Sequence, residues 1–168
     1  MHSGDGGALV QLHGGCIKEL TVAGGPFAAR TVAGRFANLW EAFQTKYPIG
    51  ETNRLQTLGP TGIGKRAKFP ALACKIAASR HLIRPMIALL KDIGFFSDRD
   101  GHRLRCYELY AEMNDIIWGN GLFIPDAEAM RLRDIFDDYL LHYNALVVHG
   151  RRYNMYNFTT KIHYMWHK

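Results

Sequence analysis

The feature that most constrains the fold is a long stripe of apolar side chains in the last third of the sequence. Large apolar residues recur there at intervals of three and four, the spacing that places side chains on one face of an α-helix. They are Leu132, Ile135, Phe136, Tyr139, Tyr143, Leu146 and Val147. Pro125 suits the start of this helix and Gly150 its C-terminal cap. The sequence therefore predicts a long amphipathic helix over residues 125–150 that packs against other elements.

Two more segments of helical periodicity lie on either side of a glycine-rich stretch. The first begins at Thr31 and must end before Pro48, which cannot continue a helix. The second starts near Pro70, a residue suited to a first helical turn, and is expected to kink or break just before Pro85. The glycines of residues 48–68 predict a loop of about 20 residues between the two helices.

The remaining periodic segments predict one helix of ordinary length and one short helix. Ser97 and the residue after it offer an N-cap to a helix that closes near Gly119. A last short helix is predicted between Thr159 and Lys168. Alternating polar and apolar residues flanked by hairpin turns are absent from the sequence, so strands are expected to be short, with residues 8–12 as a candidate.

These elements predict an all-α fold, an irregular antiparallel bundle of four to five helices with a glycine-rich loop, in which the first helix packs against the long helix. The length of 168 residues suits one domain with its own core. Residues 1–30 carry no secretory signal pattern and are interpreted as a flexible glycine-rich leader, and residues 31–168 as the helical domain. Apolar residues make up 48% of the chain, which is globular composition.

The cysteines and the apolar runs limit the classes of function. Cys16, Cys74 and Cys106 are far apart and odd in number, so neither a disulfide framework nor a CxxC metal site is expected, and a reducing compartment fits. Apolar runs fall short of the roughly 18 residues that cross a bilayer, so a membrane partner is not expected. We therefore predict an intracellular protein, nuclear or cytoplasmic. Nucleophilic catalysis has no support, because none of the cysteines lies in a motif with a histidine.

Basic residues point to a polyanionic partner. The formal charge is +6, and the candidate contacts to nucleic acid fall in two groups. They are Lys65, Arg66, Lys68, Lys75, Arg80 and Arg84, and then Arg151 and Arg152. Residues 59–65 match G-x-x-x-x-G-K, but a basic residue follows where a phosphate-binding loop needs serine or threonine, so a nucleotide site is not favoured. Tyr153, Tyr156 and Phe158 accompany the second group, a mixture used to stack bases. The alternative for both groups is an ordinary solvated or core-covering surface.

A histidine pair suggests a metal site. His163 and His167 are four residues apart, a spacing that lets both imidazoles reach one divalent ion. A third ligand could come from His142 on the long predicted helix, or from His149, Asp138 or Asp134 there. The residue after His163 is a tyrosine, whereas zinc peptidases carry a glutamate at that place. The alternative is that these histidines are surface or core residues. We therefore expect no cofactor, with one divalent metal such as zinc as the alternative.

The order of these features resembles a multicopy family of uncharacterised dinoflagellate proteins. Residues 70–82 fit P-x-L-x-x-K-x-A-x-x-R-H-L, helices follow, and residues 161–167 fit K-x-H-x-x-x-H. The likeness covers roughly residues 40–167 and implies a transposon-like or otherwise amplified gene. It assigns no activity. The positions that it marks are Lys75, Arg80, His81, Lys161, His163 and His167.

The sequence thus predicts a non-catalytic helical interaction module that binds nucleic acid and belongs to a mobile-element-like protein. The first alternative is a metal-binding HxxxH domain or a metal-dependent enzyme. The second is a plain protein-interaction domain, whose partners would be other protein segments.

Overall fold

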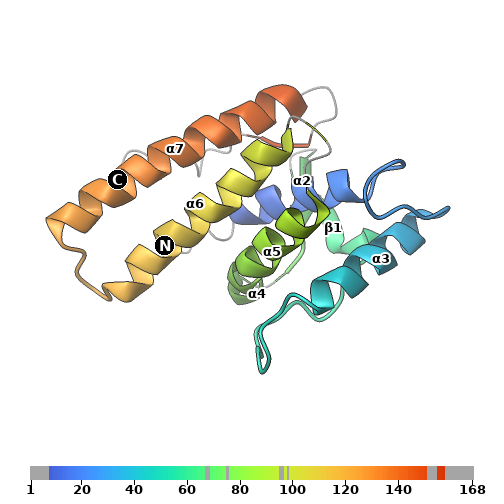
Figure 1. Cartoon of the computed structure of the whole chain (residues 1–168), viewed down its shortest axis with the longest axis horizontal. Coiled ribbons are helices and arrows are strands. Elements are labelled where there is room, and N and C mark those ends of the chain that lie inside the picture. The colour runs from blue at the N-terminus through green and yellow to red at the C-terminus, as the bar shows by residue number, and fades with distance from the viewer. Residues whose placement is uncertain are drawn as a thin grey trace.

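A computed structural model describes residues 8–66, 69–74, 76–94, 97, 99–150 and 155–157 of the chain. It is mostly helical, as predicted, with one small two-stranded sheet (Figure 1). The helices are α2 (Val10–Leu20), α3 (Val32–Gln44), α4 (Ile76–His81), α5 (Ile83–Ile93), α6 (Arg99–Gly119) and α7 (Asp126–Gly150). A 3-10 turn, η2 (Pro60–Gly62), precedes the strands β1 (Ile63–Arg66) and β2 (Phe69–Leu72). Within the described residues, none of the helices is long and apolar enough to span a membrane.

The helices α6 and α7 form an antiparallel pair along the length of the molecule (Figure 1). The predicted apolar stripe of α7 faces the core, where Phe136 stacks on Tyr139 and Tyr139 on Tyr143. Tyr110 of α6 meets the Tyr139 ring edge-on. Gly121, in the turn between the two helices, has a φ of 67°, a backbone conformation that favours glycine. The helix predicted over residues 125–150 is confirmed.

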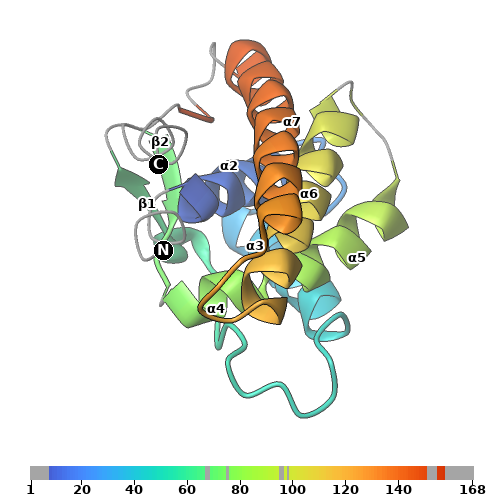
Figure 2. The ribbon, with the colours of Figure 1, turned by 90° about the vertical axis from the view of Figure 1, so that its left-hand side faces the viewer.

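The most deeply buried element is α2, in which every residue except Lys18 is buried. Figure 2 shows it between the β1–β2 hairpin and α6. Gly14 allows β2 to approach, because a Cβ atom there would lie 2.6 Å from the backbone of Ala71. The expected flexible leader over residues 1–30 is therefore wrong for residues 8–20, and the strand considered at residues 8–12 is helical. The glycines serve close packing here, and residues 1–7 lie outside the described residues.

The β1–β2 hairpin was not predicted. The two strands are antiparallel, with Ile63 opposite Leu72 and Lys65 opposite Pro70, and β2 packs on α2. The prediction of a loop through residue 68 and a helix from Pro70 is therefore wrong, because α4 begins only at Ile76. Strands of four residues are too short to show a period of two, and a proline is tolerated in a two-stranded hairpin, where both strands are edges.

The break expected before Pro85 is confirmed. Helix α4 ends at His81 and α5 begins at Ile83, which places Pro85 in the first turn of α5, where no intrahelical donor is needed. Helix α3 begins as predicted, with Thr31 Oγ1 accepting a hydrogen bond from the Gly34 amide at 3.0 Å. Its main helical partner is α5 rather than the long helix α7. The short helix predicted after Thr159 lies outside the described residues.

Candidate ligand-binding pocket

A pocket of about 360 Å³ opens where the end of α4, the start of α5 and the second half of α6 meet the loop after α3. Its walls combine apolar, aromatic and charged side chains, the mixture that small-ligand sites use for affinity and for orientation. The lining residues are Pro48, Glu51, Arg80, His81, Ile83, Arg84, Pro85, Ala111, Asn114, Asp115 and Trp118. Two of the residues predicted to bind nucleic acid, Arg80 and Arg84, are among them.

A guanidinium and an indole form the aromatic side of the pocket. The guanidinium carbon of Arg80, in the last turn of α4, lies 4.9 Å from the centroid of the Trp118 ring. Trp118 is 61% exposed, near the end of α6. A cation over an indole face is attracted by the ring quadrupole, which favours this arrangement of the two side chains. The result is a large aromatic surface that is held beside a positive charge and stays open to solvent.

A second arginine lies on the same pocket, in an ion pair. Both Asp115 oxygens accept hydrogen bonds from Arg84 Nη2, at 2.8 and 2.9 Å. The two side chains are 69% and 63% exposed, so the pair contributes roughly 0–1 kcal/mol to stability. A guanidinium carries five N–H donors, and these bonds start from one nitrogen. The Arg84 guanidinium can therefore keep Asp115 and still offer other N–H groups to an anion.

An imidazole and a carboxylate also line the pocket. His81 Nδ1 lies 2.7 Å from Glu51 Oε2, and Glu51 Oε1 accepts a hydrogen bond from the Asn53 amide at 2.7 Å. The Asn53 amide, with a smaller contribution from His81, holds the pKa of Glu51 below its usual range. Glu51 is thus negatively charged near neutral pH. The pocket combines opposite charges with an aromatic face, which suits a ligand that has both polar edges and a flat ring.

The side chains of the other predicted nucleic-acid residues lie outside the described part of the structure. Lys65 and Arg66 belong to β1, in the hairpin that packs on α2, and their side chains are outside the described part. Lys68, Lys75, Arg151 and Arg152 also lie outside the described residues, as do Tyr153 and Phe158. Among the predicted residues whose side chains the structure describes, Arg80 and Arg84 meet in this pocket. Sequence reasoning missed Trp118, whose signal was a large aromatic residue directly before the glycine that closes a helix.

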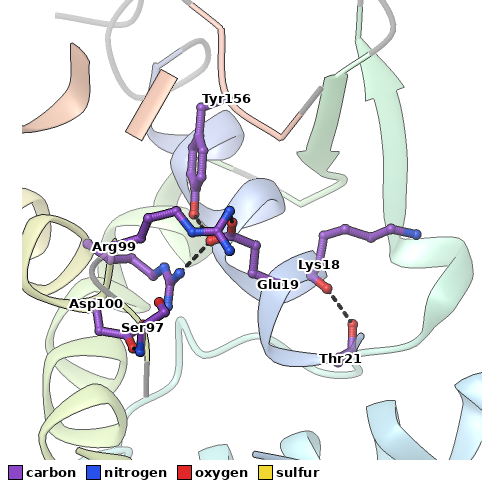
Figure 3. A network of polar contacts seen from close by, with 8 residues as sticks. Lys18, Glu19, Thr21, Ser97, Arg99, Asp100 and Tyr156 are labelled. Carbon is purple, nitrogen blue, oxygen red and sulfur yellow. Dashed lines mark hydrogen bonds and ion pairs between the residues drawn. The ribbon is translucent and has the colours of Figure 1, made fainter. Parts of the chain in front are cut away.

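Tyr156, predicted to stack on bases, is instead buried in a polar network around Glu19 (Figure 3). Its hydroxyl donates to Glu19 Oε2 at 2.9 Å. Arg103 and Arg99 pair with the same carboxylate at 2.5 and 2.8 Å, and Arg103 also pairs with Asp100. Buried charges need such partners, because an unpaired one would lose its hydration without compensation. The network joins α2, α6 and residues 155–157 and has a structural role.

His13 is a second buried polar group of α2. Its Nε2 lies 2.9 Å from the Ser79 carbonyl oxygen, so Nε2 carries the proton and Nδ1 accepts from the Tyr107 hydroxyl at 2.9 Å. Burial lowers the pKa of His13 to about 4. Burial also raises the pKa of the neighbouring Cys16 thiol to about 12, which keeps it protonated and unreactive near neutral pH. These groups connect α2 to α4 and α6.

The predicted metal ligands are largely outside the described structure. His163 and His167 both lie there, whereas His142 is on α7 and contacts His102 of α6. Among the residues that the structure describes, no group of three or more histidine, cysteine or acidic side chains is placed to hold a metal ion. The site predicted from His163, His167 and His142 therefore stays a prediction.

The basic and aromatic pocket differs from the two buried networks in its exposure to solvent. Its charged groups can therefore exchange partners with a ligand. No protein-family model, curated protein or solved structure matches this chain, so the chemistry of its own residues is the basis for interpreting the pocket.

Proposed function

We propose that this chain is a non-catalytic module that binds single-stranded nucleic acid, and that the pocket at Arg80, Arg84 and Trp118 receives one nucleotide. The observation that carries this proposal is the Arg80 guanidinium held 4.9 Å from the centre of the exposed Trp118 ring, in a pocket that also presents Arg84. Proteins that bind single strands combine aromatic side chains, on which bases stack, with positive charge along the backbone path.

The exposed indole is the proposed stacking surface. A base that stacks on an aromatic side chain gains roughly 1–3 kcal/mol, whichever base it is. Arg80 restricts the orientation of the Trp118 ring before the ligand arrives, which lowers the entropy lost on binding. Bases in a duplex are stacked on one another and would have to be unpaired to reach the indole. This requirement favours single strands.

Arg84 is the proposed phosphate contact. Its hydrogen bonds to Asp115 use Nη2, and the ion pair is exposed, so other N–H groups of the guanidinium can bind a phosphate oxygen. Asn114 also lines the pocket and carries both a donor and an acceptor, which suits the polar edge of a base. The formal charge of +6 favours the encounter with a polyanion.

Fluorescence anisotropy with labelled single-stranded DNA and RNA, and with the corresponding duplexes, over a series of salt concentrations tests the proposal. We expect Trp118→Ala to weaken single-strand binding about 5- to 150-fold, the equivalent of one lost base stack. Arg84→Ala is expected to lower the slope of log affinity against log salt by roughly 0.7, the value for one phosphate on a single strand.

Two matched variants separate the pocket from general surface effects. Phe123→Ala removes an aromatic side chain that is 86% exposed just beyond α6, and Arg133→Ala removes an exposed positive charge on α7. Both are expected to bind as the unmodified protein does. Equal losses in the Trp118 and Phe123 variants would exclude stacking in the pocket, and absence of binding at low salt would exclude the function as a whole.

A further inference from the structure

Two histidines meet across the α6–α7 pair, near the first turns of α6, whereas the pocket uses the second half of that helix. His102 Nδ1 lies 2.8 Å from His142 Nδ1, and the ring centroids are 5.0 Å apart. A neutral imidazole has one N–H and one bare nitrogen, so one Nδ1 donates the shared proton and the other accepts it. Both residues are only partly buried, so the pair is accessible to small solutes.

A carboxylate lies on the Nε2 side of the His142 ring. Asp138 Oδ1 lies 3.6 Å from His142 Nε2, and Asp138 Oδ2 accepts a hydrogen bond from Arg105 at 2.9 Å. A carboxylate beside Nε2 favours a proton on that nitrogen and leaves the lone pair on Nδ1. In metal sites a carboxylate commonly accepts a hydrogen bond from the histidine nitrogen that does not bind the ion, and Asp138 would have to move several tenths of an ångström closer to Nε2 to do so.

His102 provides the second lone pair. The neutral imidazole is the form that binds metal ions. The His149 ring stacks on His102, with centroids 6.3 Å apart, which restricts the orientation of the His102 ring. Two imidazoles from different helices thus present the same type of nitrogen to each other, 2.8 Å apart.

We propose that His102 and His142 together bind one divalent cation of the zinc type through their Nδ1 atoms. The ion takes the place of the shared proton, which moves through solvent from His102 Nδ1 to His102 Nε2, so both rings stay neutral. Zinc lies about 2.0–2.1 Å from imidazole nitrogen, and tetrahedral geometry then separates two nitrogens by roughly 3.3 Å. The rings have to separate by roughly 0.5 Å from their present 2.8 Å. Water completes the coordination, so the affinity is expected to be lower than that of a four-ligand structural site.

The test uses the full chain, purified without a histidine tag and titrated with zinc chloride at pH 7 by calorimetry. We expect binding with an upward shift of the melting temperature, because an ion that binds only the folded state stabilises it. His102→Asn and His142→Asn are each expected to remove this binding event. The matched control is the double variant His163→Asn, His167→Asn, in which the pair of C-terminal histidines is absent and the event is expected to remain.

The opposite pattern would overturn the proposal, namely binding lost in the His163 and His167 double variant and unchanged in the His142 variant. Circular dichroism establishes whether each variant is folded. If a variant does not fold, nuclear magnetic resonance of the unmodified protein tests the proposal instead. Long-range proton–nitrogen spectra of the imidazoles are expected to show both Nδ1 resonances, of His102 and His142, shifting at saturating zinc. Unchanged resonances would overturn the proposal.

Discussion

The substitution Gly14→Ala tests the packing at the centre of the molecule. A Cβ atom at this position would lie 2.6 Å from the N and Cα atoms of Ala71 and from the carbonyl carbon of Pro70. Ordinary van der Waals contact begins near 3.4 Å, so the strand would have to move by almost 1 Å. Because the obstructing atoms are backbone atoms of β2, no side-chain rotation can relieve the contact, and the strand has to shift away from α2.

Two opposing contributions determine the magnitude. Alanine favours a helix over glycine by roughly 1 kcal/mol. Overpacking of a well-packed core costs about 1–3 kcal/mol, and the upper end applies where the backbone must move. We therefore expect the free energy of unfolding to fall by about 2 kcal/mol, which lowers the melting temperature of a chain of this size by roughly 4–8 °C.

Thermal unfolding followed by circular dichroism measures this change, and Gly101→Ala in α6 is the matched control. A Cβ atom at Gly101 meets nothing within 4 Å, and the residue is exposed. Only the helix preference acts there, so this variant is expected to gain up to about 1 kcal/mol. The reasoning is refuted if both substitutions raise the melting temperature, since Gly14 would then have no packing role.

The two buried networks give further predictions. The substitution Glu19→Gln removes one of the carboxylates that pair with the buried Arg103 and keeps Asp100. We expect it to lower the free energy of unfolding, measured by urea unfolding, by about 3 kcal/mol. An unchanged urea midpoint would contradict a role for the network in stability. The pKa of His13 is about 4 in the folded chain and about 6.5 when unfolded, so the unfolded state binds more protons between these values. Stability should therefore fall by about 3 kcal/mol as the pH drops from 6.5 to 4, and a His13→Gln variant should show a flatter profile in urea unfolding at several pH values.

Helices with one polar and one apolar face could be predicted from the sequence. Phe136, Tyr139 and Tyr143 are buried on α7 as their spacing indicated, and Thr31 caps α3. The break before Pro85 follows from the geometry of proline alone. In each case the signal is local, because it depends on residues a few positions apart.

Helix α2 was not predicted, although its apolar residues recur at helical spacing, because the glycines within and around it favour loops over helices. Gly14 and Gly15 looked like signs of flexibility, but they make room for β2 and for the Tyr156 ring. The β1–β2 hairpin is too short for a pattern. What these residues contact depends on segments far away in the sequence.

Two charged residues of the candidate pocket could be predicted from the sequence, and the residues that they contact could not. Arg80 and Arg84 were identified by charge, yet their partners Trp118 and Asp115 come from α6 and only the folded chain brings them together. Charge alone also overestimated the basic surface, because Arg84 is paired with a carboxylate. A sequence shows how many charges a chain has, whereas the distances between them depend on the fold.

The central position of α2 has a consequence for synthesis on the ribosome. Glu19 is made early, but its hydrogen-bond donor Tyr156 follows 137 residues later. At typical elongation rates of 5–20 residues per second, the interval between the two is roughly 7 to 27 s. At the start of this interval the apolar surface of α2 lacks the strand β2, the helix α6 and the tyrosine that cover it in the finished fold, and the tyrosine is the last of the three to be made. Tyr156 comes after both α6 and α7 in the chain, so the part of the core around Glu19 closes only after these two helices have been synthesised.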